Sequence, residues 1–162
     1  MRVGFDLDHT LIDYTKSYSK LLKTKSIKNK DEIKRKFKNN IEWQEFQKSL
    51  YSEGLKHASP YKDALNIISL FNKLKVDVFI VSHKTNKTYF RSKINLKKYS
   101  FNWIKKNISK KVLIKKIYFE QSQKKKIEKI NELKLTFFVD DLLPVVKKIK
   151  KSAGILFDPY NK

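Results

Sequence analysis

The first eleven residues constrain this chain most, because an apolar run stops there abruptly on two carboxylates, Asp6 and Asp8. Apolar residues at both odd and even positions favour a strand that is covered on both faces, as in a parallel sheet. Parallel sheets bind ligands outside the carboxyl ends of their strands. Two like charges held close together repel, and a divalent cation is the usual remedy. The stretch therefore predicts a metal site at the end of a buried strand.

Length and composition narrow the class of protein. A chain of 162 residues predicts one domain spanning 1–162 with a core of its own. The sequence contains no cysteine, which excludes disulfides and thiolate metal sites. No apolar run approaches the roughly 18 residues that a membrane span needs, and no leader pattern opens the chain. We expect a soluble, cytoplasmic protein with no membrane partner.

The charge balance is strongly basic, with 38 Lys and Arg against 16 Asp and Glu and a formal net charge of +22. Such a field attracts phosphorylated partners and nucleic acid. The basic residues are nearly all lysine and are spread from Lys16 to Lys162, so a solvated lysine-rich surface explains them equally well. The composition leaves a nucleic-acid partner open.

Apolar periodicity predicts strands that alternate with helices. The predicted helices cover 14–54, a segment opened by Ser59 and Pro60, then 95–107, 122–133 and a turn starting at Pro144. The predicted strands cover 1–5, 76–81, 117–119, 136–139 and 154–157. This alternation predicts an α/β fold with a doubly wound, mostly parallel Rossmann-like sheet and helices on both faces.

Residues 14–57 interrupt this alternation with helical periodicity alone. The segment follows the first strand, and basic residues predominate between Lys16 and Lys38. It is interpreted as a small helical cap or an inserted hairpin of helices, whose lysines overhang the strand ends.

Three predicted strand ends carry groups suited to phosphate chemistry. Asp6 and Asp8 follow the first strand, Ser82 follows the second, and Asp140-Asp141 follow a later one. Carboxylates, a hydroxyl and nearby lysines are what phosphoryl transfer requires, because positioning and charge neutralisation do most of its catalysis.

These segments resemble the four motifs of the haloacid dehalogenase-like superfamily of phosphohydrolases, over nearly the whole chain. Asp6-Leu7-Asp8-His9-Thr10 is similar to the first motif, Asp-x-Asp-x-Thr. The resemblance implies that Asp6 is the nucleophile and Asp8 the general acid/base, with Thr10 on the phosphate side. Ser82 resembles the second-motif residue, whose hydroxyl binds the phosphoryl group.

The third and fourth motifs lie near the C-terminus. Lys126 resembles the phosphate-binding lysine, with Lys124 and Lys125 as alternatives because three lysines in a row blur the register. Asp140 and Asp141 resemble the acidic pair that holds magnesium. The implied Mg²⁺ ligands are these two residues, Asp6 and the backbone carbonyl of Asp8.

The resemblance implies a magnesium-dependent phosphomonoester hydrolase that works through an aspartyl-phosphate. The presence of Asp8 resembles the phosphatases rather than the dehalogenases, and Leu7 stands where transporting ATPases carry lysine. The expected substrate is a small phosphorylated metabolite, a sugar phosphate or nucleotide. A phosphorylated nucleic-acid end is an alternative, which the basic charge favours and the lack of interleaved aromatic and basic residues near Ser82 disfavours. A non-catalytic nucleic-acid-binding protein on the same fold is another.

Overall fold

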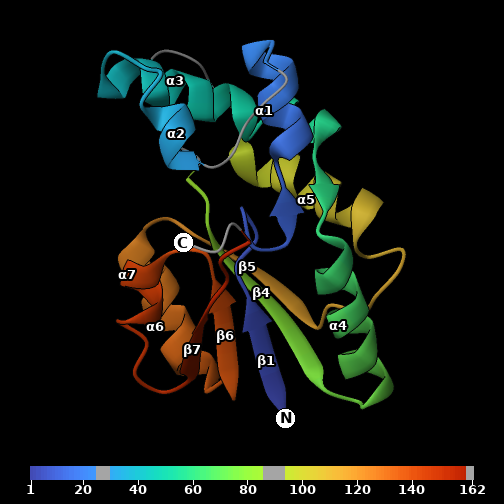
Figure 1. Ribbon diagram of the computed structural model, residues 1–162. Coiled ribbons are helices and arrows are strands. Elements are labelled where there is room, and N and C mark those ends of the chain that lie inside the picture. Colours follow the sequence, from blue (N-terminus) through green and yellow to red (C-terminus); the bar gives the residue numbers. More distant parts are fainter. Residues whose placement is uncertain (25–29, 86–93, 160–162) are drawn as a thin grey trace.

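The chain folds around a five-stranded parallel sheet (Figure 1), in a computed structural model that describes residues 1–24, 30–85 and 94–159. The strands are β1 (Arg2–Phe5), β4 (Asp77–His83), β5 (Lys116–Glu120), β6 (Phe137–Asp140) and β7 (Ala153–Leu156). Their spatial order is β5-β4-β1-β6-β7, and each neighbouring pair runs parallel. The fold is α/β and Rossmann-like, as predicted.

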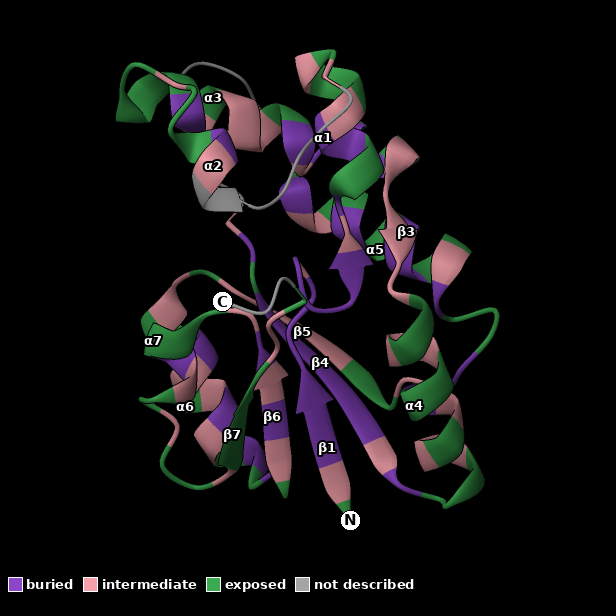
Figure 2. Ribbon diagram, viewed as in Figure 1, coloured by how far each residue is buried: buried purple, intermediate pink, exposed green. Residues whose placement is uncertain are grey.

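Helices flank both faces of this sheet. They are α4 (Lys62–Lys73), α5 (Leu96–Asn107), α6 (Gln123–Leu133) and α7 (Leu143–Val146). Val78 and Ile80 of β4 join one buried cluster with α4 and α5, while Phe79 and Val81 join another with α6 and α7. Side chains alternate between the two faces of a strand, so the continuous apolar run of β4 contributes to both buried clusters. The buried strands are visible at the centre of Figure 2.

Strand β1 lies at the centre of the sheet because both of its faces are suited to burial. Val3 and Phe5 belong to the cluster with α4 and α5. On the opposite face, a Cβ atom added to Gly4 would lie 2.5 Å from Leu135 Cδ1 and 2.7 Å from Phe138 Cδ2. The glycine therefore lets this cluster pack directly against the β1 backbone, next to the carboxyl end of that strand.

A helical layer lies over the carboxyl ends of the strands (Figure 1). It consists of α1 (Thr15–Leu22), α2 (Lys30–Lys34), α3 (Asn40–Leu50) and the 3₁₀ helix η1 (Glu53–His57). Rings from several of its segments pack together, with the Tyr18 and Phe46 centroids 6.0 Å apart and those of Phe37 and Trp43 5.4 Å apart. Trp43 is buried in this layer and Trp103 in the main core. The predicted helical segment 14–54 is thus several short helices, and its residues 25–29 lie outside the described part of the chain.

The prediction that Ser59 and Pro60 open a helix is wrong. They form the short strand β3 (Ser59–Pro60), which pairs antiparallel with β2 (Ile12–Asp13), and α4 begins only at Lys62. The Tyr61 amide donates to the Leu11 carbonyl, at 3.1 Å. This long-range pairing outweighs the local preference of a Ser-Pro pair for a helix start. It also brings the two ends of the helical layer together.

The other predicted elements of the sheet are present with shifts of one or two residues at their ends. Strand β4 runs on through Ser82 and His83, which pair with Phe119 and Glu120. Within the described residues, no helix is both long and apolar enough to cross a bilayer.

Candidate active site

The carboxyl ends of three adjacent strands bring the predicted site residues together. β1 lies between β4 and β6, and the Asp6 amide donates to the Val139 carbonyl at 2.8 Å. Asp6, Ser82 and Asp140 are each buried at this edge. Segments far apart in the sequence therefore meet where a parallel sheet presents its ligand site.

Lys126 connects the two buried carboxylates. Its Nζ lies 2.7 Å from Asp6 Oδ1 and 2.7 Å from Asp140 Oδ2. Ser122 caps α6 by accepting a hydrogen bond from the Lys125 amide, which fixes the first turn of the helix. Lys126 is buried, whereas Lys124 and Lys125 are exposed. Of the three alternatives, the structure brings Lys126 to the site, where the two carboxylates offset the unfavourable position of a cation at a helix N-terminus.

The charges at this edge do not balance. Burial lowers the pKa of Lys126, but Asp6 and Asp140 outweigh it and raise that pKa above its usual value. Burial and the charge of Asp6 raise the pKa of Asp140 to about 6, although Lys126 opposes this shift. One lysine thus faces two carboxylates, so the site favours a further positive charge.

Three carboxylates are placed so that they could share a metal ion. Asp6, Asp140 and Asp141 each offer an oxygen, and these atoms lie within 4.8 Å of one another. The Leu142 amide donates to Asp140 Oδ1 at 2.9 Å and so orients that carboxylate. Mg²⁺ prefers oxygen ligands and binds through few carboxylates plus water and phosphate oxygens, so this donor set fits it.

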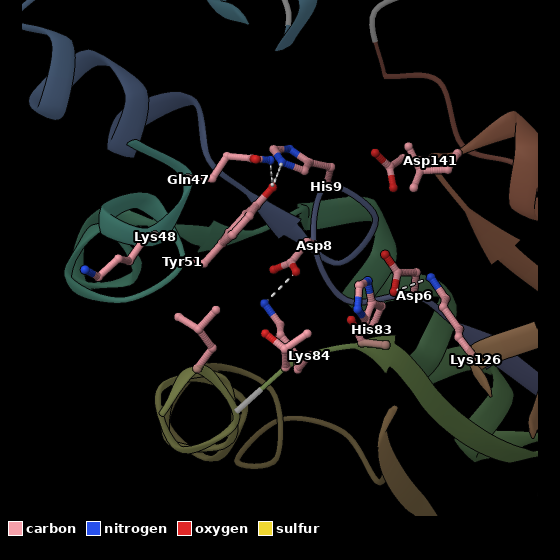
Figure 3. Close-up of a pocket in the computed structure, with 14 residues that line it drawn as sticks. Asp6, Asp8, His9, Gln47, Lys48, Tyr51, His83, Lys84, Lys126 and Asp141 are labelled. Atoms are coloured by element: carbon pink, nitrogen blue, oxygen red, sulfur yellow. Dashed lines mark hydrogen bonds and ion pairs between the residues drawn. The ribbon is translucent and has the colours of Figure 1, made fainter. Parts of the chain in front are cut away.

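The Asp8 carboxylate lies outside this group and is held by other partners. Its Oδ2 lies 2.5 Å from Lys84 Nζ, and its Oδ1 accepts a hydrogen bond from the Tyr14 hydroxyl at 2.6 Å. The side chain is thus engaged by Lys84 and Tyr14, and the predicted metal contact of Asp8 through its backbone carbonyl stays a prediction. Figure 3 shows Asp8 facing Lys84 on one side of the cavity, and Asp6 facing Lys126 on the other.

The environment keeps Asp8 ionised. Burial raises the pKa of Asp8, but the charge of Lys84 and hydrogen bonds from Lys84 and Tyr14 outweigh burial and lower it. Burial and the Asp8 charge raise the pKa of Tyr14 well above its usual value, so Tyr14 stays protonated as a donor. Lys84 is buried, and its Nζ lies 4.8 Å from the centroid of the Tyr51 ring.

Sequence reasoning missed Lys84 and Tyr14. A signal existed for Lys84, because it follows Ser82 by two residues at a strand end and can share its side. The sequence holds no such signal for Tyr14, because its position depends on how the helical layer folds back over the loop that carries Asp8.

The loop that carries Asp8 is attached to the helical layer through His9. His9 has a φ of 59°, in the left-handed region. Its ring centroid lies 4.9 Å from that of Tyr14 and 6.1 Å from that of Tyr51, and its Nε2 lies 3.3 Å from the Tyr51 hydroxyl. A buried aromatic cluster thus holds the strained backbone in place.

The remaining predicted residues differ in placement. Ser82 lines the central cavity, as does His83 beside it. Thr10 is buried, its hydroxyl has no hydrogen-bond partner in the described part of the protein, and it does not line the cavity. Thr10 is thus not among the residues that line the cavity, and its predicted place beside the phosphate stays a prediction. Burial, together with the charges of Lys126 and Lys84, lowers the pKa of His83, against opposing contributions from the Gln121 backbone and Asp6.

A cavity of about 220 Å³ joins the sheet edge to the helical layer. Its lower wall includes Asp6, Asp8, Ser82, Lys126 and Asp141, while α3 and the residue after it contribute Gln47, Lys48 and Tyr51 (Figure 3). Leu96, at the start of α5, closes another side. The arrangement can hold an anion between a lysine, a hydroxyl and a carboxylate cluster.

In comparisons with known proteins, no protein-family model matches the chain, and no curated protein matches it either.

Proposed function

We propose that this protein is a magnesium-dependent phosphomonoester hydrolase of the haloacid dehalogenase-like type. The observation that carries the proposal is the contact of Lys126 with both Asp6 and Asp140 at the carboxyl edge of the sheet. Asp141 completes a group of oxygens that suits Mg²⁺. Held by Asp6, Asp140, Asp141 and the Asp8 carbonyl, Mg²⁺ would neutralise the repulsion between an anionic nucleophile and an anionic phosphate.

In this proposal, the residues of the chain carry each step of the reaction. The Asp6 carboxylate attacks phosphorus, and the bond from phosphorus to the leaving oxygen breaks. Lys126 and Ser82 bind the phosphoryl oxygens, where charge spreads in the transition state. Water then cleaves the aspartyl-phosphate at phosphorus and regenerates Asp6.

Asp8 acts as general acid and then as general base. Because Lys84 keeps the resting carboxylate ionised, the proton that Asp8 gives to the leaving oxygen comes from the Lys84 ammonium. When Asp8 deprotonates the attacking water, that proton returns to Lys84. The 2.5 Å contact between Asp8 Oδ2 and Lys84 Nζ supports this route.

We also propose that residues 14–57 form a small cap on a doubly wound sheet. The pairing of β2 with β3 joins both ends of this segment. Gln47, Lys48 and Tyr51 belong to the segment and line the cavity. They are therefore candidates for contacts with the substrate beyond its phosphate.

The test is hydrolysis of p-nitrophenyl phosphate with Mg²⁺ and with EDTA. The Asp6→Asn variant should lose at least about 10³-fold in kcat, since it removes the nucleophile. Asp63→Asn on α4 is the matched control, because Asp63 is exposed in the first turn of that helix. If Asp6→Asn retained the wild-type rate, the proposal would be wrong. If no phosphate ester were hydrolysed but nucleic acid still bound, the non-catalytic alternative would replace it.

A further inference from the structure

A second hollow adjoins the proposed active site along the same helix. This hollow, the α5 groove, has a volume of about 370 Å³ and lies between η1 and α5. Ser52 and Glu53 of its wall follow Tyr51 of the first cavity, and Tyr99 lies one turn beyond Leu96. Three residues of helix rise about 4.5 Å, so Leu96 and Tyr99 lie on the same side of α5, about one turn apart. The two hollows thus have walls formed by neighbouring residues of the same segments.

The size of the first cavity requires most of a larger substrate to lie outside it. Its volume of about 220 Å³ is below the roughly 300–1,000 Å³ of sites that enclose a drug-sized ligand. A phosphoryl group and the atoms next to it fill such a space. The remainder of a polymer would continue into the neighbouring hollow.

The α5 groove combines an exposed ring with basic side chains. Tyr99 is 40% exposed, and Lys56 and Lys106 line the groove from its two sides. The Trp103 Nε1 donates to the Ala58 carbonyl at 3.2 Å, and this bond holds α5 against the residue that follows η1. Glu53 is the carboxylate that also lines it. An exposed ring beside lysines suits single-stranded nucleic acid, because bases stack on the ring while cations neutralise the phosphates.

The distribution of charge along the surrounding chain also favours binding of nucleic acid. No Asp or Glu lies between Asp77 and Glu120, although Lys and Arg recur throughout that segment. This segment includes α5 and the strand end that carries Ser82 and Lys84. The basic residues of this segment therefore have no acidic neighbours within the segment itself, unlike those of α6, where Glu128 and Glu132 accompany the lysines.

We infer that the substrate is the phosphorylated end of a single-stranded nucleic acid. This inference rests on the proposed function, according to which the terminal phosphate is hydrolysed. The terminal phosphate enters the first cavity, and the next nucleotide lies in the α5 groove. Its base stacks on Tyr99, and Lys56 and Lys106 contact the backbone phosphates.

Binding tests this inference without any turnover. In EDTA, a fluorescent single-stranded hexanucleotide with a terminal phosphate is titrated and its anisotropy followed. Tyr99→Ala should weaken binding at least about fivefold, because stacking on one ring gives an effect of that size or more. Tyr99→Phe should restore it. Phe101→Ala is the matched control, since Phe101 is 52% exposed on α5 but does not line the groove.

A salt series tests the two lysines. In single strands each phosphate contact contributes about 0.7 to the slope of log affinity against log salt, so Lys56→Gln with Lys106→Gln should reduce that slope by about 1.4. Lys73→Gln with Lys147→Gln removes the same charge elsewhere on the surface and should leave the slope near that of the wild type. Equal effects of the two pairs would overturn the inference, as would equal effects of Tyr99→Ala and Phe101→Ala.

Hydrolysis separates this inference from the proposed function. The measured quantity is kcat/KM on the end-phosphorylated hexanucleotide divided by kcat/KM on p-nitrophenyl phosphate. Tyr99→Ala should lower that ratio at least about fivefold. A mononucleotide or sugar phosphate that binds as tightly as the hexanucleotide at the same salt would overturn the inference and leave the phosphatase proposal standing. Absence of all hydrolysis would remove the phosphatase proposal, while the binding experiments would still decide whether the α5 groove holds a strand.

Discussion

Two buried lysines meet carboxylates on opposite sides of the cavity, and the balance of charge differs between them. At the sheet edge, Lys126 faces both Asp6 and Asp140, and the pKa of Asp140 rises to about 6. Under the helical layer, Lys84 forms an ion pair with Asp8 and the Tyr14 hydroxyl donates a hydrogen bond to it, and the pKa of Asp8 is lowered. Lysine and aspartate thus leave the sheet edge with an excess of negative charge, whereas under the helical layer the charge of Asp8 is balanced by that of Lys84. The first suits a metal ion and a nucleophile, and the second suits proton transfer.

Replacing Lys126 should break this contrast most severely. Lys126→Met leaves two buried carboxylates without their shared counterion, so we expect a loss of about 3–5 kcal/mol in the free energy of unfolding. The kcat for p-nitrophenyl phosphate should fall by about 10²–10³-fold, as for loss of one transition-state donor. Urea unfolding and steady-state kinetics measure the two effects.

Lys125→Met is the control for this change, because Lys125 is the exposed neighbour on the same helix turn. It should shift stability by less than about 0.5 kcal/mol. Equal losses in the two variants would show that the ion pairs of Lys126 are not what stabilises the sheet edge.

Removing Lys84 should have a smaller effect, which would sharpen the contrast. In Lys84→Met the Tyr14 hydroxyl still donates to Asp8, whose side chain is 15% exposed. We expect about 1.5–3 kcal/mol lower stability, the usual range for a lost hydrogen bond to a charged group. The pKa of Asp8 should rise, and kcat should fall by at least about 10²-fold if Asp8 and Lys84 move the proton together. A variant with normal kcat would contradict the proposed proton route.

The sheet edge was accessible to sequence reasoning, whereas the helical layer was largely not. Asp6, Ser82 and Asp140 each follow an apolar run, and parallel pairing brings such strand ends together. Lys126 could not be separated from its neighbours, because its burial depends on Ser122 capping α6 at one particular register. A three-lysine run carries no such information by itself.

The helical layer depends on contacts between residues far apart in the sequence. The pairing of β2 with β3, two residues each, is too short to leave a periodic signal, and it turned an expected helix start into a strand. The partners of His9 lie on α1 and just beyond α3, so no local pattern could indicate them. Tyr14 was missed for the same reason, whereas Lys84 had a local signal in its position two residues after Ser82.

Helix caps offer a milder comparison of the two regions. Asn39 caps α3 by accepting from the Ile41 and Glu42 amides, each at 2.9 Å, and Ser122 caps α6. Asn39→Ala and Ser122→Ala should each lower the free energy of unfolding by about 1 kcal/mol. Only Ser122→Ala should also reduce kcat, because α6 positions Lys126. Equal losses of kcat would mean that the helical layer positions the catalytic groups as much as the sheet edge does.

The smallest expected effect is the titration of His83, which lies between the two lysines. Its pKa should fall below 6.5 because of burial and the charges of Lys126 and Lys84. The unfolded chain then takes up this proton first, so stability should decline as the pH falls through 6.5 and level off below the folded pKa. Since His83 is only partly buried and solvent reaches its side chain, the change should be less than about 1 kcal/mol. NMR titration of the imidazole should give a higher pKa in Lys126→Met than in the wild type, and an unchanged value would contradict this assignment.

The most direct test of the account is chemical trapping of the covalent intermediate. Enzyme turning over a phosphate monoester with Mg²⁺ is quenched into borohydride, which reduces an aspartyl-phosphate to homoserine, and the peptides are analysed by mass spectrometry. We predict homoserine at position 6, dependent on substrate and absent when EDTA replaces Mg²⁺. Continued turnover with unmodified Asp6, or with the modification at Asp8 or Asp140 instead, would contradict the account.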